Sequence, residues 1–229
     1  MGEFRTLASA ADGFEFTAYH APAVEARRGG LLVLQEIFGV NSNIRRIADS
    51  FAAEGYEVLA PSLFDRRAPG FQAGYDDIRG IAKGRGYADK TDWALTLGDL
   101  QACIDALTGP VFAVGYCFGG TAAWLAACRA TGLAAASGFY GRLIPQFAGE
   151  TPRCPTILHF GKTDASIPLD GVERVRAAHP DLPVWLYDAG HGFCCDERPD
   201  FQPDACSLAR LRTLQLFHRN SGSRGERGG

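Results

Sequence analysis

The sequence of 229 residues has no excess of charge of either sign and no long apolar run. Its 23 basic and 26 acidic residues give a net charge of -3, so electrostatics provide no reason to expect nucleic acid or an anionic membrane as a partner. No run of about eighteen apolar residues, the length that crosses a bilayer, occurs in it. Residues 1–11 lack the apolar segment of a signal peptide. We therefore expect a cytoplasmic protein with no membrane partner.

Paired cysteine spacing is also absent. The seven cysteines lie between Cys103 and Cys206, and none forms the C-x2-C spacing of a zinc site. We therefore expect reduced thiols, most of them buried as small apolar residues. The run HGFCCD (191–196) does contain several possible metal ligands. Its adjacent cysteines would bind one tetrahedral ion poorly, and a disulfide between Cys194 and Cys195 would be strained. We expect no metal and no other cofactor.

Short apolar runs alternate with helical patterns along the chain, which predicts an α/β fold with a mainly parallel sheet. Apolar residues at consecutive positions suit strands that helices cover on both faces. Such runs occur at 31–36, 57–61, 111–116, 134–140, 155–160 and 183–188.

Apolar residues at helical spacing predict helices over 44–51, 93–107 and 205–217. Ser42 or Asn43 would cap the first of them. The last helix is expected to bury one apolar face, made of Leu208, Leu211, Leu214 and Phe217.

Three other segments complete the expected organisation. Residues 13–22 alternate like an antiparallel edge strand. Residues 66–86 are the least regular region, and within it APGFQAG (68–74) is predicted to form a loop over one edge of the sheet. The absence of repeats and long linkers predicts one domain over residues 1–219. Residues 220–229 have nothing to bury and are expected to form a disordered tail.

The run GYCFG (115–119) places Cys117 between a predicted strand and a run of small helix formers. This is the G-x-S-x-G nucleophile elbow with cysteine in place of serine. The sharp turn needs glycines because a strained nucleophile leaves no room for neighbouring side chains. A helix N-terminus also favours the thiolate, the form that attacks. Taken alone, the motif fits a buried structural cysteine equally well.

An acid and a histidine follow in the order that such an elbow requires. Asp164 comes shortly after one later strand, and His191 lies between two glycines after the next. The order nucleophile, acid, histidine favours catalysis over a structural cysteine. Asp170 is a nearby rival for the acid, but Asp164 lies closer to the end of its strand.

Several segments together resemble the dienelactone hydrolase family of α/β-hydrolases, also called carboxymethylenebutenolidase-like. They are QEIFGVN (35–41), APSLFDRRAPG (60–70), GYCFGG (115–120), GKTDASIP (161–168) and AGHGF (189–193). The resemblance covers about residues 10–218 and implies the α/β-hydrolase fold, a mainly parallel sheet flanked by helices on both faces. It also implies a triad of Cys117, Asp164 and His191.

The same resemblance gives roles to the residues around the triad. Glu36 becomes a carboxylate that pairs with the thiol and accepts its proton, and the backbone N–H groups of Ile37 and Phe118 become the oxyanion hole. A glutamate that ends a buried apolar strand must in any case be paired or protonated, because an isolated buried carboxylate is costly.

The sequence departs from the family pattern in the substrate pocket. Members that cleave dienelactone hold the substrate carboxylate with two arginines and a tyrosine, and the matching positions here are Ile81, Cys195 and Arg85. Arg79 and Arg85 could rebuild part of this clamp, although a solvated charged face is the alternative. Phe38 is expected in the same pocket.

We expect a hydrolase without a cofactor that cleaves a small lactone or activated ester through an acyl-enzyme on Cys117. It would be a monomer or a weak homo-oligomer and would not bind nucleic acid. One alternative is a ligand-binding protein on the same fold without catalysis. Another is a thiol redox sensor built around Cys117, against which the absence of a C-x-x-C motif argues.

Overall fold

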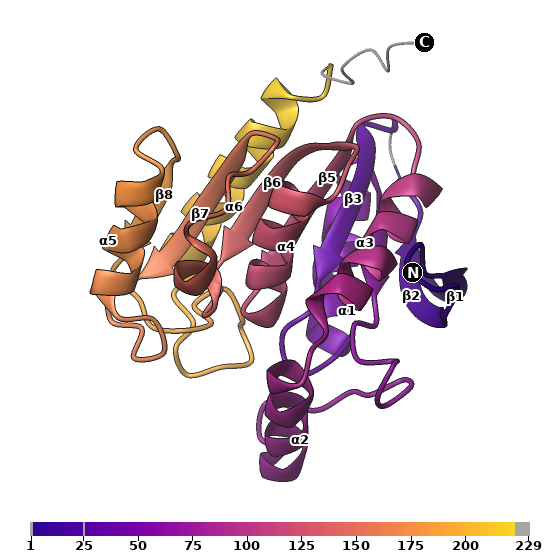
Figure 1. The fold of residues 1–229 in the computed structure, drawn as a ribbon, viewed down its shortest axis with the longest axis horizontal. Helices are drawn as coiled ribbons and strands as arrows, with labels where there is room; N and C mark the ends of the chain where they lie inside the picture. Colours follow the sequence, from indigo (N-terminus) through magenta and orange to yellow (C-terminus); the bar gives the residue numbers. More distant parts are fainter. Residues whose placement is uncertain (1, 25, 223–229) are drawn as a thin grey trace.

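The structure is a computed structural model that describes residues 2–24 and 26–222. It is built on one eight-stranded sheet (Figure 1). The strands are β1 (Glu3–Ala8), β2 (Glu15–Ala21), β3 (Gly29–Leu34), β4 (Tyr56–Pro61), β5 (Val111–Tyr116), β6 (Leu133–Phe139), β7 (Thr156–Gly161) and β8 (Val184–Tyr187). They lie in the order β1-β2-β4-β3-β5-β6-β7-β8. The strands from β3 onward run parallel to one another, and β2 runs antiparallel to both of its neighbours, β4 and β1.

Helices cover both faces of the sheet, as the sequence predicts. They are α1 (Ser42–Ala53), α2 (Ile78–Asp89), α3 (Trp93–Ala106), α4 (Phe118–Arg129), α5 (Leu169–Ala178) and α6 (Pro203–Arg219), with a short 3-10 helix at Ile144–Phe147. In β3, Leu31 and Val33 belong to the apolar cluster that includes residues of α1 and α6. Leu32 and Leu34 belong to the cluster that includes residues of α3 and α4. Because successive side chains of a strand point to opposite faces, this run of four apolar residues is buried from both sides.

The antiparallel edge of the sheet differs from the prediction. β2 is antiparallel as expected, but it lies between β4 and β1, so β1 forms the edge. β1 pairs with β2 from Glu3 opposite His20 to Ala8 opposite Glu15. Its residues are mostly exposed, so it lacks the buried apolar face by which a strand is recognised from sequence.

Two helix predictions also need correction. Asn41 caps α1, since its side chain accepts a hydrogen bond from the backbone N–H of Ile44 at 3.2 Å; neither Ser42 nor Asn43 does so. Residues 68–74, predicted as a loop, contain no helix, but the region 66–86, described as the least regular, also contains the first part of α2. Only two residues of α2, both glycines, are buried, so the helix has no apolar stripe to reveal it.

The face of α6 that meets the sheet matches the predicted one only in part, since Phe217 is buried and Leu214 packs against the core. Leu208 and Leu211 are 41% and 51% exposed, whereas Ala209, Thr213 and Phe217 are buried. Residues 223–229, most of the predicted tail, lie outside the described residues. Within the described part of the chain, no helix is both long and apolar enough to span a membrane.

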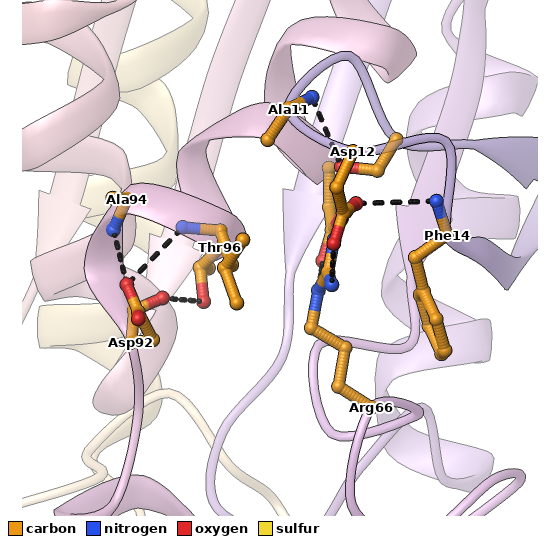
Figure 2. A network of polar contacts seen from close by, with 10 residues as sticks. Ala11, Asp12, Phe14, Arg66, Asp92, Ala94 and Thr96 are labelled. Carbon is orange, nitrogen blue, oxygen red and sulfur yellow. Dashed lines mark hydrogen bonds and ion pairs between the residues drawn. The ribbon is translucent and has the colours of Figure 1, made fainter.

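A cluster of charges holds the segments around α3 together (Figure 2). Arg66, in the loop after β4, pairs with Asp12 at 2.8 Å and with Asp99 of α3 at 2.7 Å. The hydrogen bond from the guanidinium lowers the pKa of Asp12 to about 2. Asp92 caps α3 by accepting from the backbone N–H of Ala94 at 2.9 Å. These contacts fix the start of α3, which directly follows α2.

Candidate active site

Cys117 lies at the sharp turn between β5 and α4. Its backbone has φ 55° and ψ -113°, a conformation that side chains rarely adopt and that strains the chain at this point. A Cβ on Gly115 would overlap the carbonyl oxygen of Gly119, and one on Gly119 would overlap that of Leu34. The two glycines are therefore required, as the elbow motif predicts. The N–H of Cys117 donates to the carbonyl oxygen of Phe139 at 3.0 Å.

The structure brings Cys117, His191 and Asp164 into one chain of contacts. His191 Nε2 lies 3.1 Å from the sulfur of Cys117, and its Nδ1 lies 2.7 Å from Oδ2 of Asp164. The other oxygen of Asp164 accepts from the backbone N–H of Ser166 at 2.8 Å. The acid is thus buried and oriented by the turn that follows β7.

The rival acid lies elsewhere. Asp170 is exposed on the first turn of α5 and pairs with Arg174 at 2.9 Å. The choice of Asp164 over Asp170, based on distance from the strand end, therefore agrees with the geometry.

The histidine of this chain is charged at neutral pH. Burial opposes a charge on His191, but the sulfur of Cys117 and the hydrogen bond to Asp164 outweigh it and raise the pKa of His191 to about 10. An imidazolium 3.1 Å from the sulfur favours the thiolate, the nucleophilic form of cysteine.

Glu36 is almost fully buried just after β3, at 1% exposure. Its Oε2 accepts a hydrogen bond from the hydroxyl of Tyr75 at 2.6 Å. Burial raises the pKa of Glu36, because a charged carboxylate loses hydration there. Within the described residues, Oε1 has no hydrogen-bond partner and Glu36 makes no hydrogen bond to Cys117. Sequence reasoning missed Tyr75, which lies outside every periodic segment.

The loop after β3 and the first turn of α4 carry the expected oxyanion-hole groups. The N–H of Gly119 donates to the carbonyl oxygen of Gln35 at 2.8 Å, which joins the two segments. Phe118 is the first residue of α4, so its N–H has no acceptor within the helix. Ile37 follows Gln35 by two positions. The two expected donors are therefore carried by segments in direct contact.

A cavity of about 1020 Å³ opens beside Cys117. Its walls include Cys117, His191, Phe38, Tyr75, Ile81 and Arg85. The volume suits a small molecule.

Comparisons with known proteins agree with this geometry. The model of the dienelactone hydrolase family matches residues 16–221. The chain belongs to this family. It is 38% identical to a putative carboxymethylenebutenolidase of Synechocystis sp., over 82% of this chain and 84% of that protein. It is 30% identical to the carboxymethylenebutenolidase of Pseudomonas putida, over 90% of this chain and 92% of that protein.

A solved structure supports the same assignment. The crystal structure of a putative dienelactone hydrolase from Klebsiella pneumoniae superposes with a TM-score of 0.82 at 27% identity, over 96% of this chain and 99% of that chain. As a member of the dienelactone hydrolase family with the α/β-hydrolase fold, the protein is a hydrolase of the ester and lactone class.

The substrate pocket of this dienelactone hydrolase relative differs in part from the expected one. Phe38, Ile81 and Arg85 line the cavity. Cys195 does not: it is 1% exposed, and its sulfur accepts from Nδ2 of Asn43 at 3.5 Å. The N–H of Cys195 donates to the carbonyl oxygen of Gly192 at 2.9 Å. The turn closed by this hydrogen bond keeps the side chain of Cys195 inside the protein.

Two arginines of the cavity were missed from the sequence. Arg142 lies after β6 and pairs with Asp89 of α2 at 3.2 Å, and Arg198 lies 3.7 Å from Asp200. The position of Arg142 just past a predicted strand was the available signal, whereas Arg198 had none. Arg79, considered for the clamp, is not among the residues that line the cavity.

The prediction of reduced thiols is wrong for two cysteines. Cys194 is bonded to Cys206 in a disulfide, with a Cα–Cα distance of 4.8 Å. The loop after His191 folds back on the start of α6, where the N–H of Gln202 donates to the carbonyl oxygen of Phe193 at 3.0 Å, and this brings the two sulfurs together. Cys194 therefore cannot act as a metal ligand. Among residues 2–24 and 26–222, no group of three or more metal-binding side chains is placed to hold an ion.

Proposed function

We propose that the protein hydrolyses a small lactone or activated ester through a covalent acyl-enzyme on Cys117. The observation that carries this proposal is the chain of contacts from sulfur to imidazole at 3.1 Å and from imidazole to carboxylate at 2.7 Å, at the wall of a cavity. Cys117, His191 and Asp164 act as nucleophile, general acid and base, and orienting group.

The thiol of Cys117 gives up its proton in the free enzyme, before acylation. The S–H bond of Cys117 breaks and an O–H bond forms on the free Oε1 of Glu36, whose burial favours the neutral acid. The thiolate, held by the imidazolium of His191, attacks the carbonyl carbon, and the C=O electron pair moves to the oxygen. The N–H groups of Ile37 and Phe118 stabilise this oxyanion.

The tetrahedral intermediate collapses as the bond to the leaving oxygen breaks. The leaving oxygen takes a proton from the imidazolium of His191, and in a lactone it stays on the same molecule. The sulfur is now a neutral thioester, so the charge that raises the pKa of His191 in the free enzyme is gone. Neutral His191, oriented by Asp164, then removes a proton from water, and the resulting hydroxide attacks the thioester. Collapse of this second intermediate releases the acid and restores the thiolate. No cofactor takes part in this route.

The substrate class follows from the nucleophile and the pocket. A thiolate suits lactones and enol or aryl esters, whose leaving groups depart readily. Of the arginines around the cavity, Arg142 already pairs with Asp89, and Ile81 lines the wall where a clamp arginine would stand. We therefore propose neutral or weakly anionic small substrates.

A panel of lactones and small esters tests the proposal. Purified protein is assayed for turnover, and intact mass is measured after a rapid quench. Cys117→Ala is the inactive comparison, and Cys154→Ala is the matched cysteine control. We expect turnover and an acyl adduct in the parent and in Cys154→Ala only. Absence of both turnover and adduct with every activated ester would favour the alternative, a ligand-binding protein without catalysis.

A further inference from the structure

Tyr75 stands between the cavity and the buried carboxyl of Glu36. It lines the cavity, and its ring packs against that of Phe38 with a centroid distance of 4.4 Å. Its hydroxyl donates to Oε2 of Glu36 at 2.6 Å and lies 2.9 Å from Nδ2 of Asn43. Burial raises the pKa of Tyr75, so the hydroxyl keeps its proton and remains a donor.

The neighbours of Asn43 fix the direction of these hydrogen bonds. Its Oδ1 accepts from Nη2 of Arg46 at 3.3 Å, and its Nδ2 faces the sulfur of Cys195 as well as Tyr75. A flipped amide would place its NH2 group against the guanidinium, which has only donors. Nδ2 therefore donates to the oxygen of Tyr75, and the single hydroxyl proton goes to Glu36. Only Oε1 of Glu36 is left to take a proton.

We propose that Tyr75 is a positioning residue for Glu36. Its hydroxyl holds Oε2 as a hydrogen-bond acceptor, and this leaves Oε1 of the carboxylate to take the proton of Cys117. This inference rests on the proposed function, in which Glu36 receives that proton. The balance is simple: the S–H bond breaks, the Oε1–H bond forms, and Tyr75 keeps its own proton. A hydrogen bond to a charged acceptor stabilises the ionised carboxylate, which burial alone would destabilise.

Other titratable and charged groups also face Glu36. They are His191, Cys195, Glu197 and Arg198 from the segment after β8, Tyr116 of β5, and Tyr140 after β6. Replacing Tyr75 by phenylalanine removes one hydroxyl and leaves all of them in place. A difference between the two proteins therefore reports on that hydroxyl.

The experiment measures how fast Cys117 is alkylated by iodoacetamide as a function of pH in the parent and in Tyr75→Phe. Mass spectrometry of the peptide that carries Cys117 gives the rate, and the peptide of Cys154 serves as the reference in the same digest. We expect the acid limb of the profile to move to lower pH by about one to two units in Tyr75→Phe, because a carboxylate without this hydrogen bond binds the proton of Cys117 more tightly. Around that limb the rate rises about tenfold or more, and at high pH the two profiles meet.

Two further variants separate the proposed role from a structural one. Tyr87→Phe, on the neighbouring helix α2, is expected to leave the profile unchanged. Glu36→Gln is expected to remove the limb, and Tyr75→Phe added to Glu36→Gln is expected to produce no shift. Replacing Tyr75 by 3-fluorotyrosine, a stronger donor in the same place, moves the limb to higher pH.

An unchanged limb in Tyr75→Phe, a shift to higher pH, or an equal slowing at every pH overturns the inference. So does a shift that persists beside Glu36→Gln, since Tyr75 would then act through another group. No ester is present in this measurement. If the protein cleaves nothing in the ester panel but shows the shift, the proposed function is wrong and the link between Tyr75 and Glu36 is still supported.

Discussion

Replacing Cys117 by alanine is expected to lower the pKa of His191 by at least about two units. The sulfur lies 3.1 Å from Nε2 of the ring. Two unit charges at that separation interact by about 5 kcal/mol at an effective dielectric constant of about 20, which corresponds to about four pKa units. Solvent at the cavity screens part of this, and the contact with Asp164 remains, so two units is the lower bound.

The measurement is an NMR titration of the imidazole nitrogens in the parent and in Cys117→Ala. His191 of the parent is expected to titrate near 10. His159, whose pKa burial lowers to about 3, stays neutral over the range and serves as an internal reference. Cys154→Ala is the control and is expected to match the parent. If His191 still titrates near 10 without Cys117, the sulfur carries no charge in the parent, and the argument for a resting thiolate fails.

Three other outcomes are expected. Asp164→Asn is expected to lower kcat by up to about 10⁴, because the tautomer of His191 is no longer controlled. Asp170→Asn is expected to leave kcat unchanged, because Asp170 pairs with Arg174 at the surface. Steady-state assays measure both values, and the reversed pattern would identify Asp170 as the acid. Cys206→Ser is expected to lower the free energy of unfolding by about 3 kcal/mol, because the disulfide closes a loop of 12 residues. Urea unfolding without reductant measures this, and equal midpoints for the parent and the variant would refute it. Neutral esters are expected to be turned over with a kcat/KM at least equal to that of matched carboxylated esters. A strong preference for the carboxylated ester that disappears in Arg85→Ala would contradict the proposed pocket.

The contacts among Cys117, His191 and Asp164 could be predicted because their causes are local or follow from the sheet. The elbow around Cys117 is set by glycines within a few positions of it. Asp164 and His191 each follow a strand of a parallel sheet, and the carboxyl ends of such strands meet at one edge. Sequence order was therefore enough to bring the three side chains together.

The features that could not be predicted depend on contacts that leave no local pattern in the sequence. Tyr75 bonds to Glu36 across 39 positions from a loop without periodicity. The disulfide between Cys194 and Cys206 depends on how one irregular loop folds back. β1 is held by main-chain pairing with β2, so its side chains carry little apolar signal. Leu208 showed that helical spacing alone does not say which side of α6 faces the sheet.

The glycines of α2 affect how the substrate range of this family can change. Gly84 packs so closely on the carbonyl oxygen of Ile37 that a side chain there would clash, whereas at Gly86 a side chain would meet open space. Each glycine costs a helix about 1 kcal/mol relative to alanine, and Gly80 and Gly84 are the buried residues of α2. Variation at the exposed positions of α2 can therefore reshape what the enzyme accepts while Cys117 and the two apolar clusters stay intact. Selection for a new substrate, in nature or in the laboratory, has its most permissive starting point in this helix.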